Sequence, residues 1–429
     1  MIEEQKLHTQ SSGITVGVQR TILENRLTVL TKEVHDRPIV SCFIWYRVGS
    51  RNEELGQTGK SHFLEHILFK GTDRYHKGEI DLITLKNGGA NNAFTSNDFT
   101  AYYFNFASDR WRAALEIEAS RMRNNIFIEE EFNSEKQVVI EELLRDMDEP
   151  WEALSQEVWA TSFKQHPYHN PTIGWLDDLV RASAEDLKRY YDQWYHPRNA
   201  ILVIVGDIES DRTLSYVREL FGPIPGGPEP PEMMIKEEPQ RGERRVIVRK
   251  ETLLERMMIG YHAPEVAHAD SYPLQVVSTL LSTGKTSRFY RRLQEREQSV
   301  TFAVSSYDEA IDPTLFLIRA EVKPGRKLED VERAITEEID ALKEEQVSAE
   351  ELDKAKRLIE ARFILGSEEV FNQAMMLGLF ETIYRFEYLQ TYLDYIKAVS
   401  PEDIQRVVRR YLNQDNRTVG YLIGVSGNS

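Results

Sequence analysis

The apolar and polar positions of the chain alternate with two different periods. Short runs rich in β-branched and aromatic residues, bounded by turn residues, predict strands. The predicted strands are residues 27–31, 39–48, 90–95, 100–106 and 201–205. Longer segments with apolar residues three and four apart predict helices. These are residues 61–69, 79–86, 111–123, 129–147, 185–194, 327–345 and 348–364. Because strands and helices do not alternate regularly, the sequence predicts an α+β fold rather than a doubly wound parallel sheet.

A change of composition divides the chain near its middle. Residues 222–245 begin with a run of Gly and Pro and continue with charged residues. Such a segment is typical of a fairly stiff linker. We therefore predict an N-terminal domain over residues 1–221, a linker over 222–245 and a C-terminal domain over 246–429, since 429 residues are enough for two cores.

The two halves contain a weak internal repeat. Ser183 is followed by acids, Arg189 and Asn199, and Ser400 is followed by acids, Arg406 and then Asn416, at the same spacing. A serine followed by acids is common helix-start chemistry and can recur by accident. The additional match of an arginine and an asparagine favours duplication, so we predict two related α+β domains.

Charge and cysteine content exclude some functions. The net charge of −17 argues against nucleic acid as a partner, because phosphate binding needs a basic surface. The single cysteine, Cys42, lies in an apolar run, which predicts a buried thiol and excludes an internal disulfide. The first eight residues have no signal or transit pattern and no apolar run is long enough for a membrane helix, so we expect a cytoplasmic protein that does not associate with membranes.

Residues 61–69 contain the strongest candidate for chemistry. In a helix, His62, Glu65 and His66 would share one face. Two neutral imidazoles one turn apart can bind zinc, while a carboxylate between them handles the proton of a metal-bound water. The order His-x-x-Glu-His is the reverse of the commoner His-Glu-x-x-His motif. The alternative is a pair of ordinary histidines beside a glutamate.

A catalytic zinc site normally has a third protein ligand. The best candidates are Glu135 and Glu142, which lie two helical turns apart and so share a face. Glu141 is a rival, although it points about 100° away from Glu142 on a helix. Carboxylates on a charged helix are usually only solvated, so this segment gains its meaning from the histidine motif.

Several motifs together resemble the pitrilysin or insulinase-like zinc peptidases, called inverzincins, and within them the short-chain branch that includes the mitochondrial processing peptidase. The resemblance extends over essentially the whole chain and is most specific in its first half. The motifs that carry it are residues 47–53, 62–66 with 69–72, 88–96, 100–103, 135–142 and 166–168.

The resemblance implies roles for individual residues. His62, His66 and Glu142 would be the ligands of one Zn²⁺, Glu65 the general base, and Glu135 the carboxylate that orients a ligand histidine. Residues 91–95 resemble the family's edge strand, which implies that a peptide substrate is bound there, at Asn92, Ala93 and Phe94. The family architecture is two related domains that face each other like a clamp.

One part of the chain departs from the family pattern. Active members usually carry an arginine and a tyrosine seven positions apart in the second domain, which hold the substrate and stabilise the oxyanion. Here these positions fall on Gln294 and Thr301. We therefore expect a heterodimer in which a related chain supplies the missing pair, unless Arg288, Arg291 or Arg296 substitutes for it.

The expected function is that of a zinc-dependent endopeptidase acting on peptides or unfolded segments. The alternative from another class is a structural or assembly subunit of the same fold. Such subunits lose metal ligands, whereas His62, Glu65, His66 and Glu142 are all present here. A zinc hydrolase of another bond is a third interpretation, but a peptide-binding edge strand does not support it.

Overall fold

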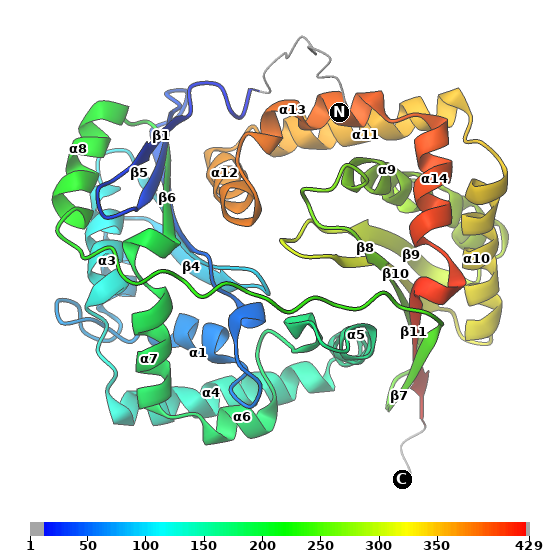
Figure 1. Ribbon diagram of the computed structural model, residues 1–429, viewed down its shortest axis with the longest axis horizontal. Coiled ribbons are helices and arrows are strands. Elements are labelled where there is room, and N and C mark those ends of the chain that lie inside the picture. The colour runs from blue at the N-terminus through cyan, green and yellow to red at the C-terminus, as the bar shows by residue number, and fades with distance from the viewer. Residues whose placement is uncertain (1–12, 426–429) are drawn as a thin grey trace.

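The computed structural model describes residues 13–425, and its framework is two β-sheets (Figure 1). The N-terminal segment assessed above for a signal peptide lies outside the described residues. The first sheet has the strand order β1-β2-β6-β3-β5-β4, and the second has the order β7-β11-β8-β10-β9. The strands are β1 Gln19–Ile22, β2 Thr28–Glu33, β3 Ile39–Tyr46, β4 Ala90–Thr95, β5 Thr100–Ala107, β6 Ala200–Gly206, β7 Arg244–Lys250, β8 Arg256–Ala263, β9 Val300–Tyr307, β10 Thr314–Val322 and β11 Arg417–Gly424.

Helices cover both sheets, which confirms the predicted α+β class. In the first half they are α1 Lys60–Ile67, α2 Glu79–Lys86, α3 Arg112–Arg123, α4 Glu129–Asp148, α5 Pro150–Ser162, α6 Leu176–Arg181, α7 Ala184–Trp194 and α8 Ser210–Phe221. In the second half they are α9 Ser271–Ser282, α10 Leu328–Glu344, α11 Ala349–Gly366, α12 Val370–Ile383, α13 Tyr388–Ala398 and α14 Pro401–Tyr411. The predicted strands and helices all occur, with shifts of a few residues at their ends.

The two sheets share one topology, apart from the extra edge strand β1. In each sheet the last strand of the half, β6 or β11, lies between a parallel neighbour and an antiparallel one. The repeated residues occupy the same places. Ser183 and Ser400 both cap a helix through a reciprocal capping box, and Asn199 and Asn416 both donate to the carbonyl five residues earlier. The internal repeat predicted from the sequence therefore corresponds to two related halves.

Each half contributes one helix to the other half's sheet. Helix α5 of the first half packs on β7, β8 and β11, and α12 of the second half packs on β3 and β6. In Figure 1, α12 accordingly lies beside the first sheet and α5 beside the second. The segment between the halves runs without regular structure to Arg244, where β7 begins one residue before the predicted end of the linker at 245. The domain boundaries themselves stay a prediction.

A glycine sets how closely α12 approaches the first sheet. A Cβ atom on Gly378 would lie 2.0 Å from Nε1 of the fully buried Trp45. We expect Gly378→Ala to lower the free energy of unfolding by about 2 kcal/mol, because overpacking outweighs the better helix propensity of alanine. Chemical denaturation measures it. Gly366→Ala is the control, since nothing lies within 4 Å of a Cβ there; equal stabilities of the two variants would contradict the close contact.

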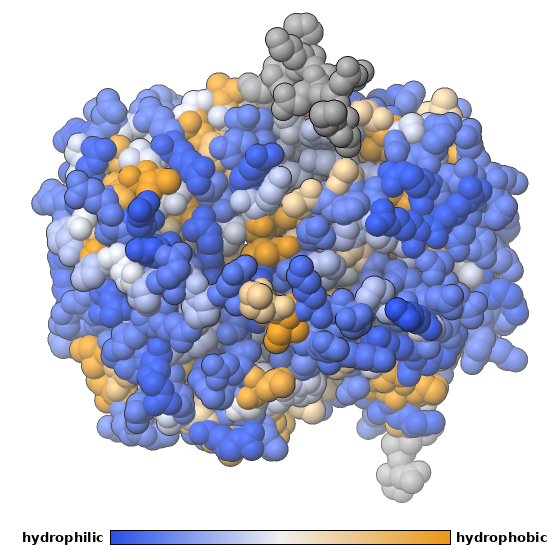
Figure 2. Space-filling model, viewed as in Figure 1, coloured by the Kyte–Doolittle hydropathy of each residue, from blue (hydrophilic) through white to orange (hydrophobic). Residues whose placement is uncertain are grey.

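The surface is mostly polar, with a group of apolar side chains near the middle of the face shown in Figure 2. No helix between residues 13 and 425 combines the length and apolar composition needed to cross a bilayer. Cys42 is buried, as predicted, and burial raises the pKa of its thiol.

Candidate metal centre

The helix that carries the histidine motif has one apolar and one polar face. It begins after Gly59, whose φ of 85° is left-handed and where a Cβ would meet a carbonyl oxygen at 2.4 Å. Phe63 and Leu64 are buried in the core of the first half, and this packing turns His62 and His66 the other way. Their rings lie 4.8 Å apart between centroids, so the helix holds both imidazoles on one side.

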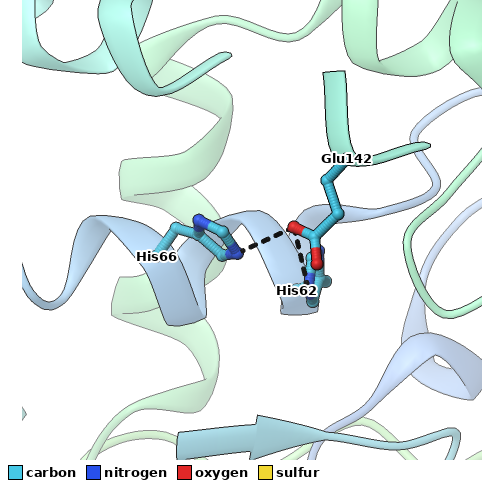
Figure 3. A group of neighbouring side chains, drawn as sticks. All are labelled: His62, His66 and Glu142. Atoms are coloured by element: carbon cyan, nitrogen blue, oxygen red, sulfur yellow. Dashed lines mark ion pairs between the residues drawn. The ribbon is translucent and has the colours of Figure 1, made fainter. Parts of the chain in front are cut away.

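Helix α4 crosses α1 and brings a carboxylate to the two imidazoles (Figure 3). Oε2 of Glu142 lies 3.4 Å from Nε2 of His66 and 3.9 Å from Nε2 of His62. Glu141, the next residue on α4, is exposed. Of the two rival carboxylates, the structure therefore brings Glu142 to the histidines.

The donor atoms fit a zinc ion. One atom each of His62, His66 and Glu142 lies within 4.8 Å of the others. Ligands at zinc-like bond lengths in a tetrahedron are about 3.3 Å apart, close to the separations found here. Two imidazoles and one carboxylate are also the donor set of several catalytic zinc sites, in which a water fills the fourth position.

Two further side chains fix the orientation of His66. Its Nδ1 lies 2.9 Å from Oε1 of Glu135, and the other oxygen of Glu135 lies 2.5 Å from Nζ of Lys70. A carboxylate at Nδ1 selects the tautomer whose Nε2 is free to bind a metal. Glu135 thus lies beside His66, and its orienting role stays a prediction. The sequence analysis included Lys70 only within the motif 69–72. The signal that could have found it is its spacing of four residues from His66.

The electrostatics of the two histidines differ. Burial lowers the pKa of His62 to about 4, helped by the neighbouring His66. Burial acts in the same direction on His66, but hydrogen bonds with Glu135 and Glu142 outweigh it and raise the pKa of His66 to about 9. The two carboxylates therefore favour the protonated, positively charged form of His66. A divalent cation between them can take the place of that proton.

Glu65 lies between the histidines in the motif and has a partner of its own. Its Oε2 accepts a hydrogen bond of 2.5 Å from Oγ1 of Thr95, at the end of β4. Burial raises the pKa of the Glu65 carboxyl, although the Thr95 hydrogen bond opposes this. The half-buried carboxylate is thus held in place by a side chain that also lines the cavity described next.

A cavity of about 410 Å³ opens beside His62 and Glu142. His62, Thr95 and Glu142 line one side of it, and α5 lines another with Glu152 and Trp159. The sequence analysis did not predict α5. Its buried apolar residues pack against the second sheet. Residues 152, 155, 156 and 159, which follow helical spacing, line the cavity.

Comparison with known proteins places these features in one family. Residues 28–175 match the family model described as insulinase (peptidase family M16), and residues 181–359 match the model described as peptidase M16 inactive domain. The chain is 31% identical over 408 residues to the zinc protease PqqE of Helicobacter pylori. The aligned region covers 93% of this chain and 91% of that protein. The chain belongs to the insulinase family, peptidase family M16.

Other members of the M16 family extend the likeness to the full chain. An uncharacterized zinc protease of Bacillus subtilis, YmxG, is 26% identical, and the similar region covers 99% of both proteins. The crystal structure of a protease from Helicobacter pylori superposes with a TM-score of 0.91 at 30% identity, covering 94% of this chain and 99% of that one. The two-halved α+β fold is thus shared with M16 proteins of known structure.

The two positions that depart from the M16 pattern lie away from the cavity. All residues that line the cavity come from positions 62–173, so neither Gln294 nor Thr301 is among them. The hydroxyl of Thr301 donates instead to Oε1 of Glu321 at 2.8 Å. The possible substitutes do not reach the cavity either, and Arg288 is held by two hydrogen bonds to Glu351.

Proposed function

We propose that this chain is a zinc-dependent endopeptidase that cleaves peptides or unfolded segments. The observation that carries the proposal is the convergence of His62, His66 and Glu142 at distances suited to one zinc ion, beside Glu65 and an open cavity. The name of the Helicobacter pylori relative, a zinc protease, supports the reaction class.

The proton chemistry falls to Glu65. His62, His66 and Glu142 would hold the zinc ion, which would supply a Lewis acid and lower the pKa of the attacking water. Glu65 accepts the proton of the attacking water on its carboxylate and later donates it to the leaving amine. Thr95 holds one carboxylate oxygen, so the other is available for the proton.

The substrate is expected to add to the first sheet as one more strand. β4 is an edge strand, and no other strand of residues 13–425 pairs with its outer side. The amide of Ala93 donates to Oδ1 of Asn92 at 2.9 Å, which occupies that amide until a peptide replaces the side-chain oxygen. The ring of Phe94 packs against Trp45 and Phe99, and these contacts fix the position of the strand. Recognition would rest on main-chain hydrogen bonds at residues 92–94.

A partner chain is part of the proposal. The metal ligands are present, but the arginine and tyrosine positions hold Gln294 and Thr301, and the cavity is lined by the first half alone. We infer a heterodimer in which a related chain supplies the groups that hold the substrate and stabilise the oxyanion. The cytoplasm stays the predicted location.

The decisive experiment measures zinc content and cleavage of a quenched fluorescent peptide by the purified chain, alone and with a co-purifying related chain. We expect one zinc per chain, slow cleavage alone and fast cleavage with the partner. Brisk cleavage by the isolated chain would disprove the partner requirement. Absence of zinc would favour the alternative, a structural or assembly subunit of the same fold.

Glu135 is expected to act on the metal through His66. Glu135→Gln removes the charge that holds the Nδ1 proton, so we expect zinc affinity to fall about 10- to 100-fold while one zinc still binds at saturation. Competition with a chromophoric chelator measures the affinity. Glu131→Gln is the control, because Glu131 is on the same helix and pairs only with Lys77 in the described part of the chain. Unchanged affinity in Glu135→Gln would exclude the orienting role.

A further inference from the structure

A second cavity lies in the second half, at the place that corresponds to the metal-side cavity. Its volume is about 420 Å³, and its walls come from α9, β9, α11, α12 and α13. The metal-side cavity is lined by α1, β4, α4 and α5, the elements at the same positions in the fold of the first half. The second cavity contains no histidine, so it has a different chemistry.

The polar group of this second cavity is a carboxylate. Glu309 follows β9, and its Oε1 accepts hydrogen bonds from Nε2 of Gln275 and, at 3.5 Å, from the hydroxyl of Tyr388. Tyr392 in turn donates to Oε1 of Gln275 at 2.6 Å. These contacts fix the carboxylate through one oxygen. Among residues 13–425, no cationic side chain forms an ion pair with Glu309, and burial raises its pKa to about 7.

The remaining walls are of two kinds: α9 and β9 contribute mostly hydroxyl side chains, and α11, α12 and α13 contribute mostly aromatic and apolar ones. Phe363 stacks on Tyr392 with centroids 5.2 Å apart, and Phe380 stacks on Tyr388 at 4.8 Å. Met376 completes this side of the cavity. Aromatic faces attract cations as well as apolar groups, and the half-buried Glu309 carboxylate has no cationic partner among the described residues. Both features favour a ligand with one positive charge on an apolar stem.

One wall residue limits the choice of ligand. Arg362 also lines the cavity, from the exposed side of α11. It forms no ion pair with Glu309 in the described structure, and its positive charge disfavours a second cationic group on the ligand. The cavity therefore suits a monoamine better than a diamine.

We propose that this cavity is a binding site for a primary alkylammonium group, with Glu309 as its counter-ion and Phe363, Phe380 and Met376 around its stem. The same chemistry is carried by a free alkylamine and by a lysine side chain of a polypeptide. The site is independent of the metal centre and of the proposed peptidase activity.

Isothermal titration of the full chain with hexylammonium chloride and with 1-hexanol tests the charge requirement. The chelator EDTA is present, so that the amine cannot bind zinc. We expect one saturable site for hexylammonium, at least tenfold tighter than for hexanol and tighter than for 1,6-diaminohexane. Equal binding of amine and alcohol, or no saturable binding of the amine, would overturn the proposal.

Two variants assign the binding to the carboxylate. Glu309→Gln is expected to lose at least tenfold in affinity for hexylammonium and to keep its affinity for hexanol, which also shows that the cavity is intact. Asp308→Asn removes the neighbouring charge, which is exposed and outside the cavity, and should leave both affinities unchanged. Equal loss in both variants would mean that only the general negative charge matters, and would overturn the assignment.

A competition experiment distinguishes the two sources of the ammonium group. If Nα-acetyl-lysine N-methylamide displaces hexylammonium, the site accepts lysine side chains of polypeptides. If it does not, the ligand is a free amine. Either result supports the alkylammonium site, provided that both variants behave as expected.

Discussion

Replacing Glu65 by Gln should reduce kcat for peptide cleavage by about 10²- to 10⁴-fold, the range typical of a lost general base. Glutamine has nearly the same shape as glutamate but cannot accept the proton of the attacking water. Its side-chain oxygen can still accept the hydrogen bond from Thr95, so the local structure should persist. The measurement is the steady-state rate on a quenched fluorescent peptide, with the partner chain present.

Zinc content separates this effect from loss of the metal. Glu65 is not among the three residues whose donor atoms converge, so Glu65→Gln should bind one zinc per chain like the wild type. Glu54→Gln, which changes an exposed glutamate outside the motif, serves as the activity control. A Glu65→Gln protein that retains a tenth or more of the wild-type rate would exclude Glu65 as the general base.

The sequence predicted the local part of the site well, because the relevant residues follow helical periodicity. His62 and His66 are one turn apart, and the packing of Phe63 and Leu64 into the core decides which face they occupy. On the second helix the same periodicity placed Glu135 and Glu142 on one face, but only the family resemblance implied that Glu142 joins the histidines. What brings the two helices together is the pairing of their apolar faces, which the sequence indicated only through the family resemblance.

Long-range features could not be predicted in this way. Helix α5 lines the metal-side cavity only because its other face, with Leu154 and Val158, packs on the second sheet. No local pattern distinguishes such a helix from one that covers its own sheet.

The cap of α1 could not be predicted either. Buried Glu53 accepts hydrogen bonds of 2.6 Å from the amides of Gly59 and Ser61, which lie six and eight residues further along the chain.

The exchange of helices also bears on the arginine and tyrosine that are missing at positions 294 and 301. Gln294 and Thr301 belong to the half that receives α5, and α5 forms a wall between the second sheet and the metal-side cavity. Residues of the second sheet of this chain therefore do not line that cavity. A group that acts on a substrate there would have to approach from the open side, which is consistent with the proposed contribution of a second chain.

Replacing Glu142 by Gln should lower the zinc content of the purified chain from one ion to a small fraction, while Glu141→Gln should leave it unchanged. The two residues are neighbours on α4, so both variants lose one charge at nearly the same place. Of these two residues, Glu142 has an oxygen 3.4 Å from Nε2 of His66, whereas Glu141 is exposed. The comparison therefore tests direct ligation and cancels the general effect of negative charge.

The size of the effect distinguishes a ligand from an outer partner. An outer-shell carboxylate such as Glu135 is expected to contribute about 10- to 100-fold to metal affinity, so the loss in Glu142→Gln must exceed that range. Glu142 also places a negative charge 3.4 Å from Nε2 of His66, and neutral glutamine cannot replace that charge as a partner of the cation. If Glu142→Gln and Glu141→Gln both keep one zinc at wild-type affinity, Glu142 is not a ligand. The third donor would then be another carboxylate near the cavity, and Asp146 and Glu152 both line it.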